Sequence, residues 1–313
     1  MTIKSKLPTT FLIALLVAVI VLSSLIIVFQ GQIGESDEEA RLESLNNVFV
    51  AKIEDTGRMA TAMATAFAEI PEVQSAFADK DRDALIELLH ASYLALDDQF
   101  DIPQSQFHLE PATSFLRLHE LTKHGDDLSD FRNTVLAANS EQAPIAGLEK
   151  GKGGYGIRGV VPCFHEGTHI GSFEMGMSFD ETFLDDIKAN FNADLSVYMR
   201  DDISKVETFD EETQAPAAGF SLYASTMVQP LDIKEDVHSR VFDSGESEVT
   251  NSNITAPIKD YNGDIIGVVD INLESDDDLN GIASSRNAAV AAGALAFLAL
   301  CIAVWQVISR RDI

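Results

Sequence analysis

Two stretches of the sequence, VPCFHEGTHIGSFEMGM (161–177) and APIKDYNGDIIGVVDINL (256–273), share one pattern. In each, a residue before proline leads through a polar turn into a run that is typical of a strand. Both contain two glycines and an acid three residues after the second glycine, at Gly167, Gly171 and Glu174 and at Gly263, Gly267 and Asp270. We interpret the stretches as two hairpins of one design, which predicts two related modules in tandem. A chance similarity between two hairpins is the alternative.

Helical patterns precede the first hairpin. Apolar side chains recur at helical spacing before Pro71, at Leu42, Leu45, Phe49 and Ile53, so one long helix is expected there. Proline is favourable at the first position of a helix, so a second helix is expected from Pro71. The stretch DKDRDALIELLHASYLAL (79–96) predicts a third. Beyond residue 100, short alternating runs separated by Gly, Pro, Asn and Asp predict antiparallel strands.

The predicted fold class is therefore α+β, with a long N-terminal helix and two tandem modules built on antiparallel sheets. We expect a stalk helix and a helical segment over 31–98, a membrane-distal module over 99–180 and a membrane-proximal module over 181–280. About 250 residues are enough for two small domains.

Two uncharged stretches are long enough to cross a bilayer, which takes about 20 apolar residues. They predict transmembrane helices over 11–30 and 288–308 that flank the modules. A cleaved secretory signal is the alternative for the first stretch, but its apolar core is longer than such signals usually have. A buried core helix is the alternative for the second, but Trp305 near its end is more typical of a membrane span.

Basic residues predict the orientation of these spans, because short loops rich in Lys and Arg stay in the cytoplasm. They flank both spans, at Lys4, Lys6, Arg310 and Arg311. We therefore expect the tail 1–10 and the stub 309–313 in the cytoplasm. Residues 31–286 are expected outside the inner membrane of a bacterium, in a periplasmic or extracellular position.

The chain is strongly acidic, with a net charge of −28. Nucleic acid is therefore excluded as a partner, because phosphate binding needs a basic surface. We interpret the acidity as a solvated surface. Cys163 is expected in the outer domain and Cys301 in the second span, so no disulfide between them is predicted.

Two short motifs resemble catalytic or cofactor sites without their structural context. HEGTH (165–169) matches the HExxH zinc pattern, but that chemistry needs a helix, and Pro162 and Gly167 indicate a hairpin turn instead. A surface metal contact by His165 and His169 stays open. GKGGYG (151–156) matches GxGxxG, yet it leads into the strand-like IRGVV and is interpreted as a loop beside a pocket. The sequence predicts neither a cofactor nor an enzyme.

The stretch from residue 105 to residue 170 is near neutral, with eight acids and six bases, and it holds five of the seven histidines. If SFLRLH (114–119) is a strand, Arg117 and His119 share one face. Together with Arg158 they could line a concave site, in which a guanidinium grips a carboxylate or phosphate with two hydrogen bonds. The predicted site is completed by the ligand-contacting His108 and by two residues that would orient the ligand or the arginines, Tyr155 and Glu174. The alternative is that these cations form salt bridges with the acids Asp126, Asp127, Glu149 and Glu174.

These features together resemble the double Cache sensor domains of bacterial chemoreceptors, the methyl-accepting chemotaxis proteins, and of sensor histidine kinases. The resemblance covers about residues 35–280. Two stretches of the first module are especially similar to one double Cache subfamily, FHLEPATSFLRLHELTKHGDDLSDFRNTV (107–135) and GLEKGKGGYGIRGVVPCFHEGTHIGSFEMG (147–176). The resemblance implies two PAS-like modules and a ligand sensor whose membrane-distal module holds the pocket.

The expected function is a transmembrane sensory receptor that binds a small ligand outside the cell and signals inward, as in chemotaxis. The arginines favour an anion as this ligand. A homodimer through the stalk helix is expected, because its apolar stripe would otherwise face water. In the family, a basic turn such as ISRRDI (308–313) leads into a HAMP linker and an output domain, so we expect either a longer product or a separate cytoplasmic or membrane signalling partner. The alternatives are a membrane-anchored structural or interaction ectodomain, and a zinc hydrolase using His165 and His169.

Overall fold

The computed structural model describes residues 7–151, 154–200, 219–230, 235–250, 252–273, 288, 290–295, 297–299 and 302. The chain divides into two units, one formed by Leu42–Leu273 and one by Met1–Arg41 with Glu274–Ile313. In the part that the structure describes, no helix is both long and apolar enough to cross a membrane. Most side chains of the predicted span 11–30, much of the predicted span 288–308 and the whole stub 309–313 lie outside the described residues.

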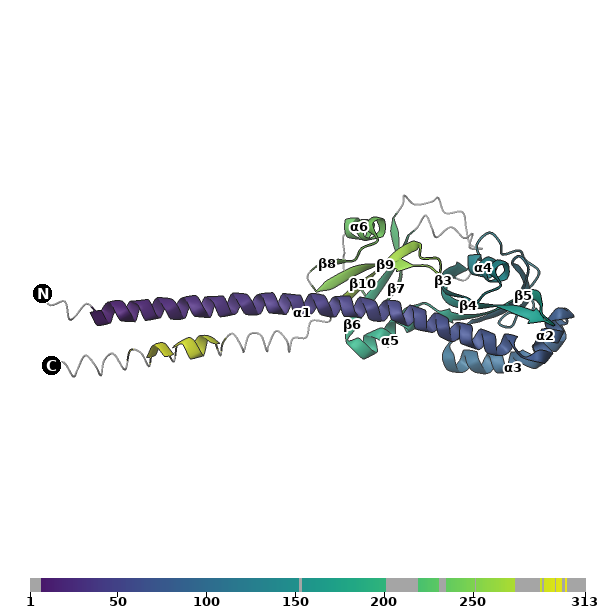
Figure 1. The fold of residues 1–313 in the computed structure, drawn as a ribbon, viewed down its shortest axis with the longest axis horizontal. Helices are drawn as coiled ribbons and strands as arrows, with labels where there is room; N and C mark the ends of the chain where they lie inside the picture. Colours follow the sequence, from purple (N-terminus) through teal and green to yellow (C-terminus); the bar gives the residue numbers. More distant parts are fainter. Residues whose placement is uncertain are drawn as a thin grey trace. The chain divides into compact units, whose positions relative to one another are not determined.

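Three helices precede the first strand (Figure 1). Helix α1 spans Leu7–Ala68, α2 spans Pro71–Ala78 and α3 spans Arg82–Phe100. Proline occupies the first turn of α2, as the sequence predicts, because this position needs no backbone N–H donor. The Asp81 side chain caps α3 by accepting a hydrogen bond from Ala84 N at 3.0 Å.

The first sheet contains five antiparallel strands in the order β2-β1-β5-β4-β3. Its elements follow in the chain as β1 (Gln104–Leu109), β2 (Thr113–Arg117), α4 (Asn133–Glu141), β3 (Ile145–Gly151), β4 (Gly154–His165) and β5 (Thr168–Ser178). Helix α4 connects β2 with β3 and packs on β3 and β4. Val135 and Ala138 of α4 bury against Val160 of β4, so α4 covers one face of this sheet.

The second sheet repeats this design, with the strand order β7-β6-β10-β9-β8. Its elements are α5 (Glu181–Phe191), β6 (Ala193–Arg200), β7 (Phe220–Ser225), α6 (Glu235–Ser244), β8 (Glu248–Thr250), β9 (Asn253–Lys259) and β10 (Ile265–Leu273). Helix α6 takes the place that α4 has in the first sheet, between the second and third strands. The prediction of an α+β chain with two related antiparallel modules is confirmed.

The two stretches that carry the repeat form the hairpins β4–β5 and β9–β10. Gly167 and Gly263 occupy their turns at φ +80° and +90°, a left-handed conformation that glycine adopts without a Cβ clash. Glu174 and Asp270 then occupy matching positions on β5 and β10, the strands in the middle of each sheet, and both side chains are buried.

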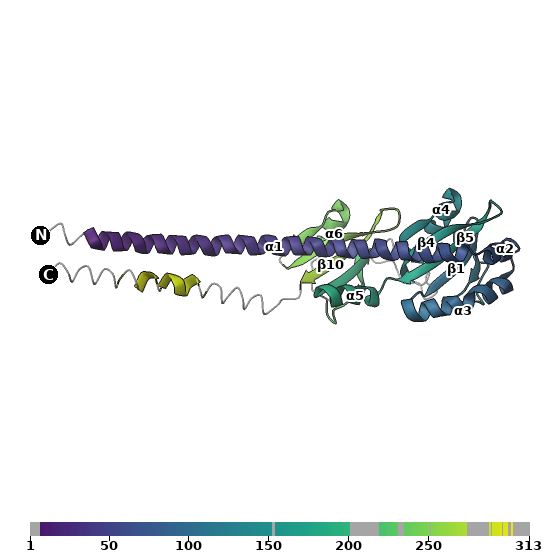
Figure 2. The same cartoon turned by 60° about the horizontal axis from the view of Figure 1, so that its bottom comes forward.

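The C-terminal part of α1 lies along both sheets (Figures 1 and 2). Leu42, Leu45 and Phe49 pack into the core of the second sheet. Further along the helix, Ala60 and Ala64 pack into the core of the first. Small side chains let the helix approach the first sheet closely, and a Cβ at Gly159 of β4 would lie 2.5 Å from the carbonyl carbon of Ala60. One helix therefore contributes to both hydrophobic cores.

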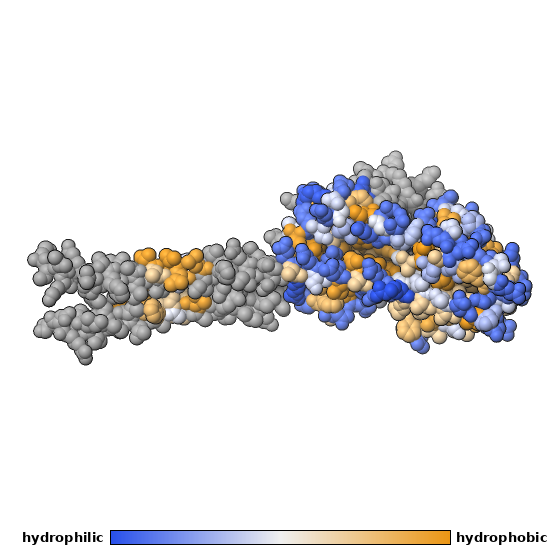
Figure 3. Space-filling model, viewed as in Figure 1, coloured by the Kyte–Doolittle hydropathy of each residue, from blue (hydrophilic) through white to orange (hydrophobic). Residues whose placement is uncertain are grey.

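The described surface of the two modules is mostly hydrophilic on the face in Figure 3, with smaller apolar areas. This agrees with the net charge of −28.

Candidate ligand site in the first module

A cavity of about 270 Å³ lies in the first module, beside the segment that leads into α4. Strand pairing brings its polar side chains together, because directly opposed residues share one face of a sheet. Gln106 of β1 lies opposite Arg117 of β2 on one side and opposite Glu174 of β5 on the other. In the adjacent row, Gly176 of β5 lies between Gln104 and Arg158. Six residues from four strands thus meet on one face of the sheet.

Four charged side chains form a buried cluster behind this surface, which we call the charge quartet: Arg132, Arg158, Glu149 and Glu174. Each is at most 5% exposed. Arg132 donates from Nε to Glu149 at 2.9 Å and from Nη2 to Glu174 at 2.5 Å. Arg158 donates from Nη1 to Glu174 at 2.6 Å and also to Gln104. Two positive and two negative charges compensate one another, as buried charges must.

Glu149 anchors the quartet to the start of α4. Its carboxylate accepts from the backbone N and the hydroxyl of Thr134 at 2.7 and 2.6 Å. Arg132 precedes α4 directly, so its position is tied to the same helix start. The quartet therefore joins the start of α4 to the middle of the sheet.

Electrostatics favour the ionised form of Glu174 but leave Arg158 weakly compensated. Burial opposes ionisation of Glu174, yet Arg132 and Arg158 outweigh it and hold the pKa of this carboxyl below its usual range. Burial, and then the nearby Arg132, lower the pKa of Arg158. Arg158 Nε makes no hydrogen bond among the described residues, and Glu149 Oε2 is 3.9 Å away. An additional anion near Arg158 would therefore be favourable.

The groups that line the cavity are mainly cations and hydrogen-bond donors. Four bases line it, Arg117, Lys123, Arg132 and Arg158, whereas Glu120 is the acid among its lining residues. Arg117 donates to both carboxylate oxygens of Asp126 at 2.8 Å. Gln106 Nε2 is a buried donor of the lining that has no partner among the described residues. The cavity can therefore offer hydrogen bonds to an anion.

A second group of unpaired polar atoms lies next to Glu174. His108 is fully buried, and its Nε2 is 3.5 Å from Glu174 Oε2. Ser114 and Ser172 lie opposite it on the neighbouring strands. Neither ring nitrogen nor either serine hydroxyl has a hydrogen-bond partner in the described part of the chain. Buried polar atoms of this kind are typical of places that hold water or a ligand.

The buried histidine predicts how stability depends on pH. Burial lowers the pKa of His108 to about 3, although Glu174 opposes this shift. Below its ordinary pKa of 6.5, the unfolded chain binds a proton that the folded chain does not, so acid favours unfolding. Between pH 6.5 and about 5, His108 should lower the free energy of unfolding by about 1–2 kcal/mol.

Urea titrations at both pH values, on the protein and on His108→Leu, measure this contribution. In the variant, the free energy of unfolding should depend less on pH, because the contribution of His108 is gone. The contribution of His119 should remain, because burial also lowers the pKa of His119. An equal change in the free energy of unfolding between the two pH values in both proteins would show that His108 is not held neutral.

The structure brings most of the predicted site residues to this region. Arg117, His119 and Arg158 line the cavity, and Glu174 and His108 lie behind it. The predicted alternative also applies in part, since Arg117 pairs with Asp126 and Arg158 with Glu174. Asp127 instead accepts hydrogen bonds from Ser129.

Tyr155 does not reach the cavity. Side chains alternate along β4, so Tyr155 lies on the opposite face from Arg158, in the core that contains Phe49. Its ring packs edge-on against Tyr223 at a centroid distance of 5.3 Å. The site residues that were not predicted from sequence include Gln104, Gln106, Arg132 and Thr134.

HEGTH forms a turn between two strands, as the sequence predicts. His165 ends β4, Gly167 occupies the turn, and His169 lies on β5 and contacts Glu110 at 2.8 Å. The helical geometry of a zinc protease is therefore contradicted at these residues. Across the described residues, no group of three or more His, Cys, Asp or Glu side chains is placed to hold a metal ion.

The comparisons with known proteins identify the class to which this fold and site belong. Residues 35–278 match the family described as the double sensory domain of two-component sensor kinases. The match covers most of the chain, so the protein belongs to this double Cache family. It therefore carries a sensory domain of the kind found in chemoreceptors and sensor kinases. No curated protein matches the chain.

Several solved structures have a similar fold. The periplasmic domain of Vibrio cholerae LuxQ is 10% identical, with 76% of this chain and 99% of that chain covered and a TM-score of 0.41. The sensory domain of the Campylobacter jejuni chemoreceptor Tlp3 is 12% identical. The match covers 80% of this chain and 98% of that chain, with a TM-score of 0.47. The sensor domain of Escherichia coli DcuS is 16% identical, with 45% and 98% covered and a TM-score of 0.36.

Proposed function

We propose that this protein is a two-pass receptor of the bacterial inner membrane that binds a small anion in the first module and transmits the signal across the membrane. The observation that carries the proposal is the cavity beside the charge quartet. Its lining presents four bases and the unused donor of Gln106, while Glu149 and Glu174 lie behind the arginines. The residues proposed to bind are Arg117, His119, Arg158 and Gln106, with Glu174 and His108 positioning them.

The cavity favours a compact ligand with a carboxylate or phosphate group. Drug-sized ligands occupy about 300–1,000 Å³, and this cavity holds about 270 Å³. Guanidinium groups donate two parallel hydrogen bonds to a carboxylate or phosphate. Arg158 Nε is available for such a bond, because it makes none among the described residues.

Signalling requires that ligand binding favour one conformation of the chain over another, by about 1–3 kcal/mol in typical allosteric proteins. Hydrogen bonds between the modules include one from Tyr261 N to Leu148 O at 3.0 Å and one from Tyr155 N to the Tyr223 hydroxyl at 3.1 Å. The proposed route runs through these contacts and through α1. On the exposed side of α1, Met59 is 46% exposed and is a candidate for a homodimer contact.

The proposal predicts that small anions raise the thermal stability of the full chain in detergent. A ligand that binds only the folded state adds about 2.7 kcal/mol when its concentration is 100 times Kd. The screen should compare phosphate, acetate, succinate and citrate with neutral diols of similar size. Stabilisation by a neutral diol but by none of the anions would contradict an anion site. No shift with any compound would favour a structural or interaction ectodomain.

A further inference from the structure

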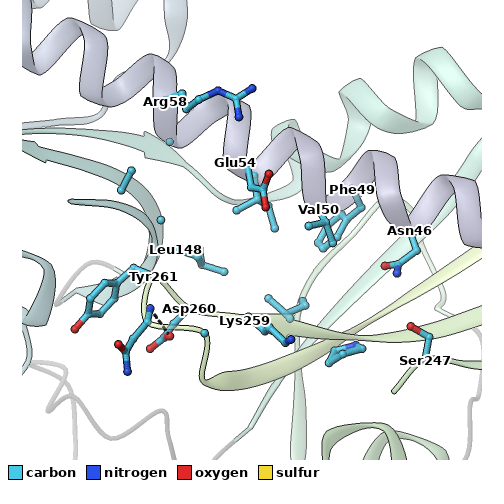
Figure 4. Close-up of a pocket in the computed structure, with 18 residues that line it drawn as sticks. Asn46, Phe49, Val50, Glu54, Arg58, Leu148, Ser247, Lys259, Asp260 and Tyr261 are labelled. Atoms are coloured by element: carbon cyan, nitrogen blue, oxygen red, sulfur yellow. Dashed lines mark hydrogen bonds between the residues drawn. The ribbon is translucent and has the colours of Figure 1, made fainter. Parts of the chain in front are cut away.

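A second cavity lies where α1, β3 and the β9–β10 turn meet (Figure 4). Its volume is about 720 Å³, which is within the range of small-molecule sites. Asn46 and Glu54 project from α1 on one side, and Lys259 and Tyr261 lie on the β9–β10 side. It shares no lining residue with the cavity of the proposed anion site. We call it the junction groove.

The floor of the junction groove is apolar. Phe49, Leu148 and Ile258 line it and are almost completely buried, and Val50 lies beside them with 40% of its surface exposed. The exposed apolar surface of Val50 is the part of this floor that an occupant would remove from water, which favours binding. An occupant with apolar side chains is therefore favoured over a purely polar one.

The rim carries one available charge of each sign. Glu54 of α1 and Lys259 of β9 line the groove, and neither has an ion-pair or hydrogen-bond partner within the described part of the chain. The other charged groups of the rim are engaged. Arg58 pairs with Asp55, and Asp260 accepts hydrogen bonds from the backbone of Asn262 and Asp264 at 2.9 and 3.0 Å.

A third polar group of the lining is also unused. Asn46 Oδ1 is buried and has no hydrogen-bond partner among the described residues. An unpaired buried acceptor is unfavourable, and a donor that reached it would remove this cost. The groove thus offers an acceptor, an anion and a cation around an apolar floor.

We propose that the junction groove binds a short peptide of two or three apolar residues. Its free ammonium group lies beside Glu54, and its carboxylate lies beside Lys259. The apolar side chains lie on Phe49, Leu148 and Ile258. A simple amine or a simple carboxylic acid would pair with only one of the two charges, so a ligand with both charges is preferred.

Such a peptide would contact both modules and α1 at once. The groove adjoins the hydrogen bond from Tyr261 N to Leu148 O, and a Cβ at Gly147 would lie 2.7 Å from Tyr261 Cα. An occupant that fits only this closely packed arrangement stabilises it. The peptide would therefore regulate how a change in the first module reaches the second.

Isothermal titration of the full chain in detergent with dileucine tests the proposal, with N-acetyl-dileucine and dileucine amide as probes that lack one charge each. Dileucine should bind, and each capped form should bind at least about 10-fold more weakly. The proposal would be overturned if dileucine and both capped forms bound with equal affinity. It would also be overturned if dileucine did not bind.

Two surface variants assign the charges without disturbing the core. Glu54→Gln should lower the affinity for dileucine and for its amide about 10-fold and leave the affinity for the acetylated peptide unchanged. Lys259→Gln should lower the affinity for dileucine and for the acetylated peptide and leave the affinity for the amide unchanged. Gln106→Leu, in the other cavity, should change none of the three affinities. Loss of dileucine binding in Gln106→Leu with full binding in both groove variants would place the peptide in the first-module cavity and overturn the proposal.

Discussion

Replacing Arg132 by methionine should lower the free energy of unfolding by about 3–5 kcal/mol, because it leaves buried carboxylates without their cation. Arg132 donates to both acids of the charge quartet, and its side chain is 5% exposed. Methionine fills a similar space, so the loss reports the missing charge and hydrogen bonds more than a cavity. Urea denaturation near pH 7 measures the change.

A second substitution distinguishes the charge from the packing. The double variant Arg132→Met/Glu149→Gln leaves one positive and one negative charge in the quartet, so the remaining charges still compensate each other. Its loss in the free energy of unfolding should be smaller, by at least about 1 kcal/mol, than the sum of the losses in the two single variants. Arg240→Met is the matched control, because Arg240 pairs with Glu248 and Asp236 at the surface and is 53% exposed. The account would be wrong if Arg132→Met and Arg240→Met had the same small effect.

Replacing Gly159 by alanine should destabilise the protein by about 3 kcal/mol, the upper end of the usual range for overpacking. A Cβ at this position would lie 2.5 Å from the carbonyl carbon of Ala60 and 2.7 Å from Thr61 Cα. Both belong to the backbone of α1, so no side-chain rotation relieves the clash. The thermal midpoint should fall by about 6–12 °C.

Gly167→Ala is the control for this variant, because a Cβ there meets nothing within 4 Å. It carries only the cost of a left-handed conformation at φ +80°, about 1–2 kcal/mol. Calorimetry of both variants measures the loss in stability of each. The difference between the two losses separates the cost of the clash with α1 from the cost of backbone strain. A larger loss in Gly167→Ala than in Gly159→Ala would show that α1 does not pack tightly on β4.

The modular fold was predictable because its signal is local. Each hairpin is indicated by a turn glycine, Gly167 or Gly263, and by the alternation of apolar and polar residues along the strand that follows. Helix α2 was predictable from Pro71 for the same reason. The strand order was not predictable, because pairing depends on contacts between segments such as β1 and β5 that are distant in the sequence.

The site was predictable only where it follows the alternation of a single strand. Arg117 and His119 share one face of the predicted strand and do line the cavity. Tyr155 and Arg158 differ by three positions along β4, so the same rule places them on opposite faces. Arg132 has no strand pattern, because the start of α4 and not a sheet register positions it.

The most direct test of the proposed anion site is a titration of the full chain, and of Gln106→Leu, with whichever anion gives the largest thermal shift. Gln106 Nε2 has no partner among the described residues, so this substitution breaks no bond in the fold. Loss of one hydrogen bond to a charged ligand, worth about 1.5–3 kcal/mol, should raise Kd at least about 10-fold at unchanged stability. An unchanged Kd in Gln106→Leu would place the anion elsewhere and contradict the site.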